Sequence, residues 1–152
     1  MFYSKRALGV GILCVGLAAT ACAFDFSYGT FFEVKNVKNK DGVLQLPLSR
    51  KKYKNVKVLS KELYGFLKQC SENCKYPAQN TLFRTEEFRQ AATNEQLFIA
   101  DISFNDEILL TFLVFNNPDK IRVKFPEAVL FTDENLKKSI EKFIKQQAEQ
   151  IQ

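Results

Sequence analysis

The segment 97–115 constrains the fold of this chain more than any other part of the sequence. Two apolar stretches, 97–104 and 107–115, flank the two-residue link Asn105-Asp106, and a link of this length and composition is typical of a β-hairpin. The second stretch is apolar on both of its faces, as is usual for the central strand of a sheet. The sequence therefore predicts a hairpin in the middle of a β-sheet.

Four other segments have the pattern of strands. Apolar and polar residues alternate in the segments 30–38, 43–50, 53–59 and 121–125, which indicates strands with one buried face. The turn between the first two contains Gly42, which accepts the positive φ that a tight turn needs. Together with the central hairpin, these segments predict a sheet of about six strands.

Two segments have the apolar spacing of amphipathic helices. The first extends from Ser60, a favourable N-cap residue, to Cys70, and the second follows Thr132, its expected cap. A third, shorter helix is predicted over residues 85–92, with Thr85 as its cap. The apolar positions of the two longer helices are Leu63, Phe66, Leu67 and Cys70 in the first and Leu136, Ile140, Phe143, Ile144 and Ile151 in the second.

Length and composition indicate one domain. The chain has 152 residues, of which 46% are hydrophobic and 26% are charged, and its 15 Phe and 5 Tyr can fill the core of a small domain. Residues 70–80 are expected to form a loop. We predict a single α+β domain over residues 24–152, in which an antiparallel sheet of about six strands carries the C-terminal amphipathic helix and a shorter helix on one face.

Residues 1–23 have the features of a secretory signal peptide. Two basic residues precede the uncharged apolar run 7–19, and an A-x-A-type cleavage site ends at Ala23. The run is shorter than the ~20 residues that span a bilayer comfortably. The sequence therefore predicts export, cleavage before Phe24, and a periplasmic or secreted mature protein.

The residues that end at Cys22 leave a second processing route open. The run Ala19-Thr20-Ala21-Cys22 resembles the lipobox of bacterial lipoproteins, with Ala19 where those proteins usually have Leu. This resemblance covers only a few residues, and it implies a lipid on Cys22 that would anchor the domain to a membrane. Aromatic residues in place of a polar spacer follow at once and favour the soluble form.

Cys70 and Cys74 are the cysteines beyond the leader. Their spacing predicts a disulfide in an oxidising compartment, and the alternative is two small apolar side chains at a helix end. A thiol–disulfide activity depends on a lowered thiol pKa, which is typical of a helix N-terminus. The predicted helix instead places Cys70 at its C-terminal end, where the helix dipole disfavours a thiolate. A structural disulfide is therefore the favoured interpretation.

Charge is unevenly distributed along the chain. Residues 35–61 include nine basic residues and one acid, whereas residues 100–134 include seven acids and three basic residues. A basic surface can bind an anionic membrane or an envelope protein of opposite charge, although lysines also protect exposed strands from aggregation. Nucleic acid is not expected as a partner, because the cluster is short and the chain is exported. The candidate contact residues are Arg50, Lys51, Lys52, Lys54 and Lys57.

The residue inventory argues against most hydrolytic mechanisms. The chain has no His, which excludes Ser-His-Asp and Cys-His arrangements and His-ligated zinc. The glycines form no phosphate-binding loop, and the acidic pairs are sequence neighbours whose side chains do not converge on one substrate. We therefore predict no catalytic residues, no cofactor and no metal.

These observations favour an exported cell-envelope protein that binds or scaffolds a partner without catalysis. Two alternatives stay open. One is a thiol–disulfide active protein that uses Cys70 and Cys74. The other is a carrier of an apolar ligand, held between a Phe-rich sheet and the C-terminal helix. The sequence indicates no oligomeric state.

Overall fold

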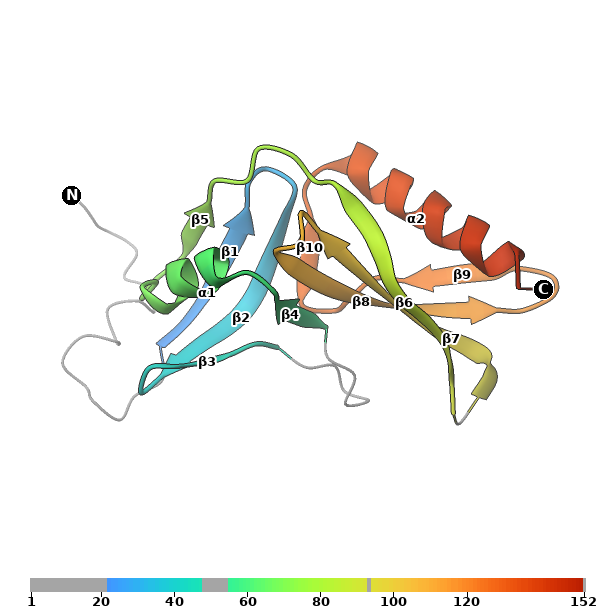
Figure 1. The fold of residues 1–152 in the computed structure, drawn as a ribbon, viewed down its shortest axis with the longest axis horizontal. Coiled ribbons are helices and arrows are strands. Elements are labelled where there is room, and N and C mark those ends of the chain that lie inside the picture. The colour runs from blue at the N-terminus through green and yellow to red at the C-terminus, as the bar shows by residue number, and fades with distance from the viewer. Residues whose placement is uncertain (1–21, 48–54, 93, 152) are drawn as a thin grey trace.

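The computed structural model describes residues 22–47, 55–92 and 94–151, and the fold of these residues is α+β, as predicted. Their strands form two five-stranded sheets, where the sequence predicts one sheet (Figure 1). The first sheet contains β1 (Cys22–Tyr28), β2 (Phe32–Lys40), β3 (Val43–Gln45), β5 (Cys74–Tyr76) and β10 (Val129–Phe131). The second contains β4 (Val56–Val58), β6 (Phe83–Ala91), β7 (Asn94–Phe104), β8 (Ile108–Asn116) and β9 (Ile121–Lys124). The helices are α1 (Lys61–Lys68) and α2 (Glu134–Glu149).

In the first sheet, β2 has β1 along one edge and two short strands along the other. Phe131 of β10 pairs with Phe32 at the start of β2, and Val43 of β3 pairs with Lys40 at its end. β2 and β3 are antiparallel around Gly42, which has a φ of 78°. The hairpin predicted from this glycine is therefore confirmed.

The sequence does not predict β1 or β5. These two strands pair in parallel, with Phe26 opposite Cys74 and Tyr28 opposite Tyr76. β5 lies in the segment 70–80, which is expected to be a loop. A strand of three residues that pairs with a distant part of the chain has no local sequence signal, because its partner alone fixes its conformation.

The second sheet is built on the predicted central hairpin. β7 and β8 are antiparallel from Leu97, which lies opposite Phe115, to the turn at Asn105-Asp106. Both turn residues have positive φ, 54° and 56°, as a type I′ turn requires. β8 has β7 along one edge and the short strands β4 and β9 along the other, and β6 pairs with the outer edge of β7.

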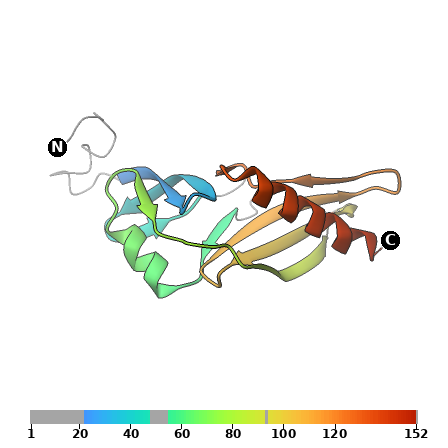
Figure 2. The ribbon, with the colours of Figure 1, turned by 90° about the horizontal axis from the view of Figure 1, so that it is seen from above.

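Side chains cap both helices. Ser60 caps α1, as predicted, and Asp133 caps α2 by accepting the backbone N–H of Leu136 at 3.1 Å. Thr132, the expected cap of α2, instead donates its hydroxyl to the carbonyl oxygen of Thr30 at 2.8 Å. α2 lies along the second sheet and α1 lies beside the first (Figure 2). The buried helix residues are Leu63 and Leu67 in α1 and Leu136, Ile140, Ile144 and Ala148 in α2.

The prediction of a short helix over residues 85–92 is wrong, because residues 85–91 belong to strand β6 (Phe83–Ala91) and Ala92 is in the turn that follows the strand. β6 is antiparallel to β7 along most of its length. Oppositely charged residues two positions apart, Arg84 with Glu86 and Glu87 with Arg89, form ion pairs along the strand. Such residues share a face in a strand but not in a helix. Pairing with β7 therefore overrides the local helix-cap signal.

Aromatic rings join the two sheets into a common core. The ring centroid of Phe32, in the first sheet, lies 5.3 Å from that of Phe104, in the second, and 5.3 Å from that of Phe131. Phe112 and Phe125 extend this cluster. The buried residues of α2 belong to the same core, so one face of the second sheet is covered by α2 and the aromatic cluster.

Candidate functional site

Glu107 connects the two sheets through two tyrosines. It follows the turn of the central hairpin, whereas Tyr28 and Tyr76 end β1 and β5. The Tyr28 hydroxyl donates to Glu107 Oε1 and the Tyr76 hydroxyl donates to Oε2, each at 2.5 Å. The two tyrosine rings stack with their centroids 5.7 Å apart. One carboxylate therefore holds the ends of two strands of the first sheet against the second sheet.

Asn105 extends this joint into the loop that precedes β6. Its Nδ2 donates to the Tyr28 hydroxyl at 2.8 Å and to the carbonyl oxygen of Asn80 at 2.7 Å. Its Oδ1 accepts the backbone N–H of Leu82 at 2.8 Å. The side chain is thus bonded through both of its polar atoms, and Asn is also a residue type that tolerates the positive φ of the turn.

Both tyrosine hydroxyl groups remain protonated at neutral pH. Burial, followed by the hydrogen bond to Glu107, raises the pKa of Tyr76 to about 12. Burial is also the largest cause that raises the pKa of Tyr28 far above its ordinary value. Both side chains therefore act as permanent hydrogen-bond donors to the Glu107 carboxylate.

A hollow of 560 Å³ lies beside the joint and is lined by residues 76–80, 82–84 and 105–107. Polar groups make up much of this lining, and charged ones bind each other: the Arg84 guanidinium lies 2.8 Å from Asp106 Oδ1. The side chains at this place connect the two sheets to each other. We therefore interpret the joint and its hollow as structural.

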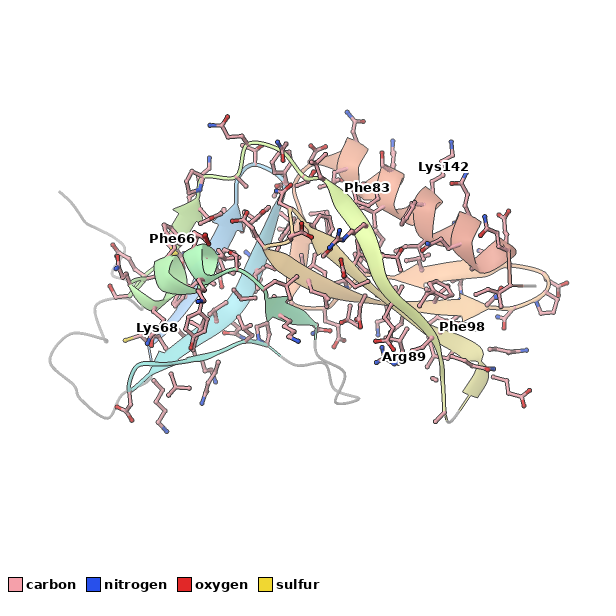
Figure 3. All side chains as sticks on the ribbon, viewed as in Figure 1. Phe66, Lys68, Phe83, Arg89, Phe98 and Lys142 are labelled. Atoms are coloured by element: carbon pink, nitrogen blue, oxygen red, sulfur yellow. A yellow bond between two sulfur atoms is a disulfide. The ribbon has the colours of Figure 1, made fainter. Side chains whose placement is uncertain are left out.

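The face of the second sheet that points away from α2 carries a different set of side chains, and we call it the open face. Phe83 lies near α2, whereas Arg89 lies away from it, on the open face (Figure 3). Cross-strand pairing arranges this face in rows, which run from β4 or β9 across β8 and β7 to β6, except that the second row begins at β8 and the last row ends at β7. The rows are Lys57–Leu109–Ser103–Arg84, then Thr111–Asp101–Glu87, then Lys124–Leu113–Ile99–Arg89, and finally Arg122–Phe115–Leu97.

An apolar floor occupies part of the open face. Leu97 and Ile99 are buried and form a cluster with Ala91, against which the half-buried Leu113 and Phe115 pack. This cluster is separate from the main core, which lies on the other face of the sheet. The open face is therefore amphipathic, and its apolar part lies toward one end of the sheet.

Three exposed cations, Lys57, Arg122 and Lys124, border the open face along β4 and β9, and we call them the cationic border. The Arg122 guanidinium lies 4.8 Å from the centroid of the Phe115 ring. Lys124 is 4.0 Å from Glu127. Among the described residues, neither Lys57 nor Arg122 forms an ion pair. This border therefore presents positive charge to solvent.

The opposite border, along β6, is neutralised by the protein itself. Arg89 lies 3.2 Å from Glu87 and 3.3 Å from Asp101, whose Oδ1 accepts the Thr111 hydroxyl at 2.7 Å. At the other end of the strand, Arg84 is paired with Glu86. We call Arg84 and Arg89 the paired border.

The hydroxyl of Ser103 donates to Glu86 Oε2 at 2.6 Å. This hydrogen bond, followed by the one from Arg84, lowers the pKa of Glu86. Glu86 therefore stays ionised, and its charge offsets that of the paired border.

The structure places one of the predicted basic contact residues on the open face. Lys57 lies in β4, whereas Arg50, Lys51, Lys52 and Lys54 lie outside the described residues, so their part in a contact surface stays a prediction. Sequence reasoning did not identify Arg122 and Lys124 as contact residues. Their signal is the alternation of charged and apolar residues over 121–125, which predicts an exposed strand face without showing what lies beside it.

The cysteines lie on the first-sheet side. The Cys70 and Cys74 sulfur atoms lie at disulfide distance, and the two Cα atoms are 6.3 Å apart. Cys70 follows Gln69, the C-cap of α1, so it lies at the end of the helix that disfavours a thiolate. Cys22, the candidate lipidation site, is the first residue of β1 and pairs with Asn39.

Within residues 22–47, 55–92 and 94–151, no group of three or more His, Cys, Asp or Glu side chains could hold a metal ion. None of the helices in this part of the chain is long and apolar enough to cross a membrane. Comparison with protein-family models, with curated proteins and with solved structures gave no match. Function is therefore inferred from the open face itself.

Proposed function

We propose that this chain is an exported, non-catalytic protein of the cell envelope that binds an anionic partner through the open face. The observation that carries the proposal is the cross-strand register of β4, β8 and β9, which lines up the cationic border beside an apolar floor. The border combines two separate parts of the sequence. Lys57 comes from one part and Arg122 and Lys124 from the other, and all three lie along the same edge of β8. A surface that combines such charge with apolar area is typical of a binding face.

Electrostatics support this function more directly than composition does. The chain carries a net charge of +5. Exposed cations such as Lys57 and Arg122, which form no ion pair with the described residues, attract anions over roughly 10 Å at moderate salt. The paired border contributes little to this attraction, because its arginines already bind acids of the same sheet. The positive field of the open face therefore comes mainly from the cationic border.

The two alternative functions receive less support from the geometry. Thiol exchange is disfavoured by the place of Cys70 at the C-terminal end of α1. The apolar ligand is expected between the Phe-rich sheet and the C-terminal helix, but there Ile140 and Ile144 of α2 are fully buried in the main core. The 560 Å³ hollow lies elsewhere and is lined by polar and charged residues such as Asn105 and Asp106.

Charge reversal tests the proposal. The triple variant K57E/R122E/K124E should lose binding to envelope fractions of the host at low salt, and wild-type binding should weaken as salt is added. The matched control K75E/K138E/K142E changes net charge by the same amount at exposed lysines outside the open face, and it should bind like the wild type. Equal binding by all three proteins would show that the open face is not the contact surface.

Export and processing need a separate measurement. The intact mass of the protein purified from its host reports the N-terminus, any acyl group on Cys22 and the oxidation state of Cys70 and Cys74 together. Cleavage before Phe24, or a lipid on Cys22, is expected for an exported protein. A cytosolic form that still starts at Met1, with both later thiols reduced, would contradict export.

A further inference from the structure

We infer that the partner of the open face is a protein that presents an amphipathic helix with one acidic flank. This inference rests on the proposed function, because it names the kind of anion that the open face receives. Backbone pairing, the dimensions of the face and the difference in charge between its two borders support it independently of one another.

The two central strands of the open face leave no backbone hydrogen bonds for an added chain. β7 and β8 are paired along both of their edges, so their N–H and C=O groups are used within the sheet. A segment that lies on this face must therefore satisfy its own backbone groups, as an α-helix does. The other face of the same sheet already accommodates a helix, since α2 packs on β8 and β9.

The dimensions of the open face also fit a helix. Its two borders are three strand spacings apart, or about 14 Å, and a helix with its side chains is about 10–12 Å wide. Along β8, the cationic border extends from Lys57, opposite Leu109, to Arg122, opposite Phe115. Six residues of strand span about 20 Å, which corresponds to about 13 residues of helix.

The charges of the two borders require an asymmetric helix. The cationic border needs acids from the partner, whereas the paired border already has acids of its own, Glu86 beside Arg84 and Asp101 beside Arg89. A matching helix therefore carries Glu or Asp along the flank that faces β4 and β9. Its apolar stripe lies over Leu113 and Phe115, the half-buried side chains of the floor, and over the half-buried Leu109 of the first row.

An anionic membrane is a poorer match than a protein. Peripheral membrane binding usually inserts apolar side chains into the headgroup region, but Leu97 and Ile99 of the floor are only 4% and 3% exposed. The most exposed large apolar residues lie outside the rows of the open face: Val43, Leu59, Tyr64, Leu82, Leu130 and Ile151.

A synthetic helix provides the test. The probe is a fluorescent amphipathic peptide of about 18 residues, with Glu along one flank of an apolar stripe, and its dissociation constant is measured by anisotropy at low salt on protein purified from its host. We expect binding that K57E/R122E/K124E weakens about tenfold or more and K75E/K138E/K142E leaves unchanged. The neutral variant K57Q/R122Q/K124Q should weaken binding by a smaller factor, and circular dichroism shows that each variant is folded.

The control probes separate this inference from the proposed function. A peptide of the same composition, scrambled so that it has no amphipathic period, should bind far more weakly. Three results would overturn the inference of an acidic helix. They are equal binding of the two peptides, no binding of either peptide, and binding only to vesicles of phosphatidylcholine with about one third phosphatidylglycerol. If binding of the vesicles or of the scrambled peptide is lost in K57E/R122E/K124E, the proposed binding of an anionic partner stands. If no probe binds in a way that K57E/R122E/K124E weakens, both proposals fail.

Discussion

The hydroxyl group of Tyr76 donates a hydrogen bond of 2.5 Å to Glu107, which lies 31 residues away in the sequence. Tyr76 ends β5, a strand of three residues that pairs, among the described strands, only with β1 and in parallel. So short a parallel pairing gives a strand little stability of its own. The bond to Glu107, which Tyr28 shares from the neighbouring strand, therefore helps to fix the edge of the first sheet against the second.

Replacing Glu107 with Gln should destabilise the fold. The amide oxygen of Gln can accept one tyrosine hydroxyl, but its amino group cannot accept the other, so one partly buried donor loses its acceptor. We expect the free energy of unfolding to fall by roughly 1–3 kcal/mol, measured by urea denaturation. Glu127→Gln is the matched control, because the Glu127 side chain is 44% exposed and lies 4.0 Å from Lys124. A Glu107→Gln protein as stable as this control would show that the joint does not stabilise the fold.

Alkaline pH should weaken the same joint. The pKa of Tyr76 is about 12 in the folded protein against an ordinary value of 10.0, so folding favours its protonated form. This contribution is fully present below about pH 10 and is lost as the pH rises from 10 to 12. The free energy of unfolding of the wild type should therefore fall more steeply over this range than that of Tyr76→Phe. Tyr64→Phe, which changes an exposed tyrosine, should follow the wild type, and identical slopes for all three proteins would contradict the expectation.

Local signals explain which parts of the fold could be predicted. The central hairpin combines a strand that is apolar on both faces with a two-residue link, and α1 has a cap and an apolar stripe within a few residues of each other. The division of the strands into two sheets has no local signal in the sequence. It depends on which distant strands pair with β2 and which pair with β8. The segment 85–92 carries a helix-cap pattern that pairing with β7 overrides.

The site was predictable only in part, for the same reason. Lys57 belongs to a basic cluster that is visible in the sequence, and its exposed position follows from the alternation of its strand. Arg122 and Lys124 are 65 and 67 positions further along the chain, and only the pairing of β4 and β9 with the same edge of β8 brings the three cations into one border. The joint of Glu107 with two tyrosines likewise depends on contacts between the sheets.

Removing the Ser103 hydroxyl should change the ionisation of Glu86. The hydrogen bond from Ser103 is the largest cause that lowers the pKa of this carboxyl, and the interaction with Arg84 is the next. In Ser103→Ala, the pKa of Glu86 should therefore rise toward its ordinary value, as measured by NMR titration of the carboxyl carbon. The folded wild type gains this contribution to stability above the ordinary pKa and loses it as the pH falls, so Ser103→Ala should also be less sensitive to acid. An unchanged pKa would show that Ser103 does not bind Glu86.

Three glycines should respond differently to alanine, because their surroundings differ. Gly29 has a φ of 56°, and a methyl group there would clash with the carbonyl oxygen of Ala78, so Gly29→Ala must distort the turn between β1 and β2. Gly42 has a φ of 78°, but an added Cβ there would meet none of the described residues within 4 Å, so Gly42→Ala should cost only the strain of a positive φ, about 1–2 kcal/mol. Gly65 lies inside α1, where an added Cβ would meet no other described side chain or segment within 4 Å, so Gly65→Ala should raise stability by about 0.5–1 kcal/mol. In thermal unfolding, the midpoint temperature should therefore be highest for Gly65→Ala, followed by the wild type, Gly42→Ala and Gly29→Ala. A Gly29→Ala protein as stable as Gly42→Ala would show that the β1–β2 turn does not pack against Ala78.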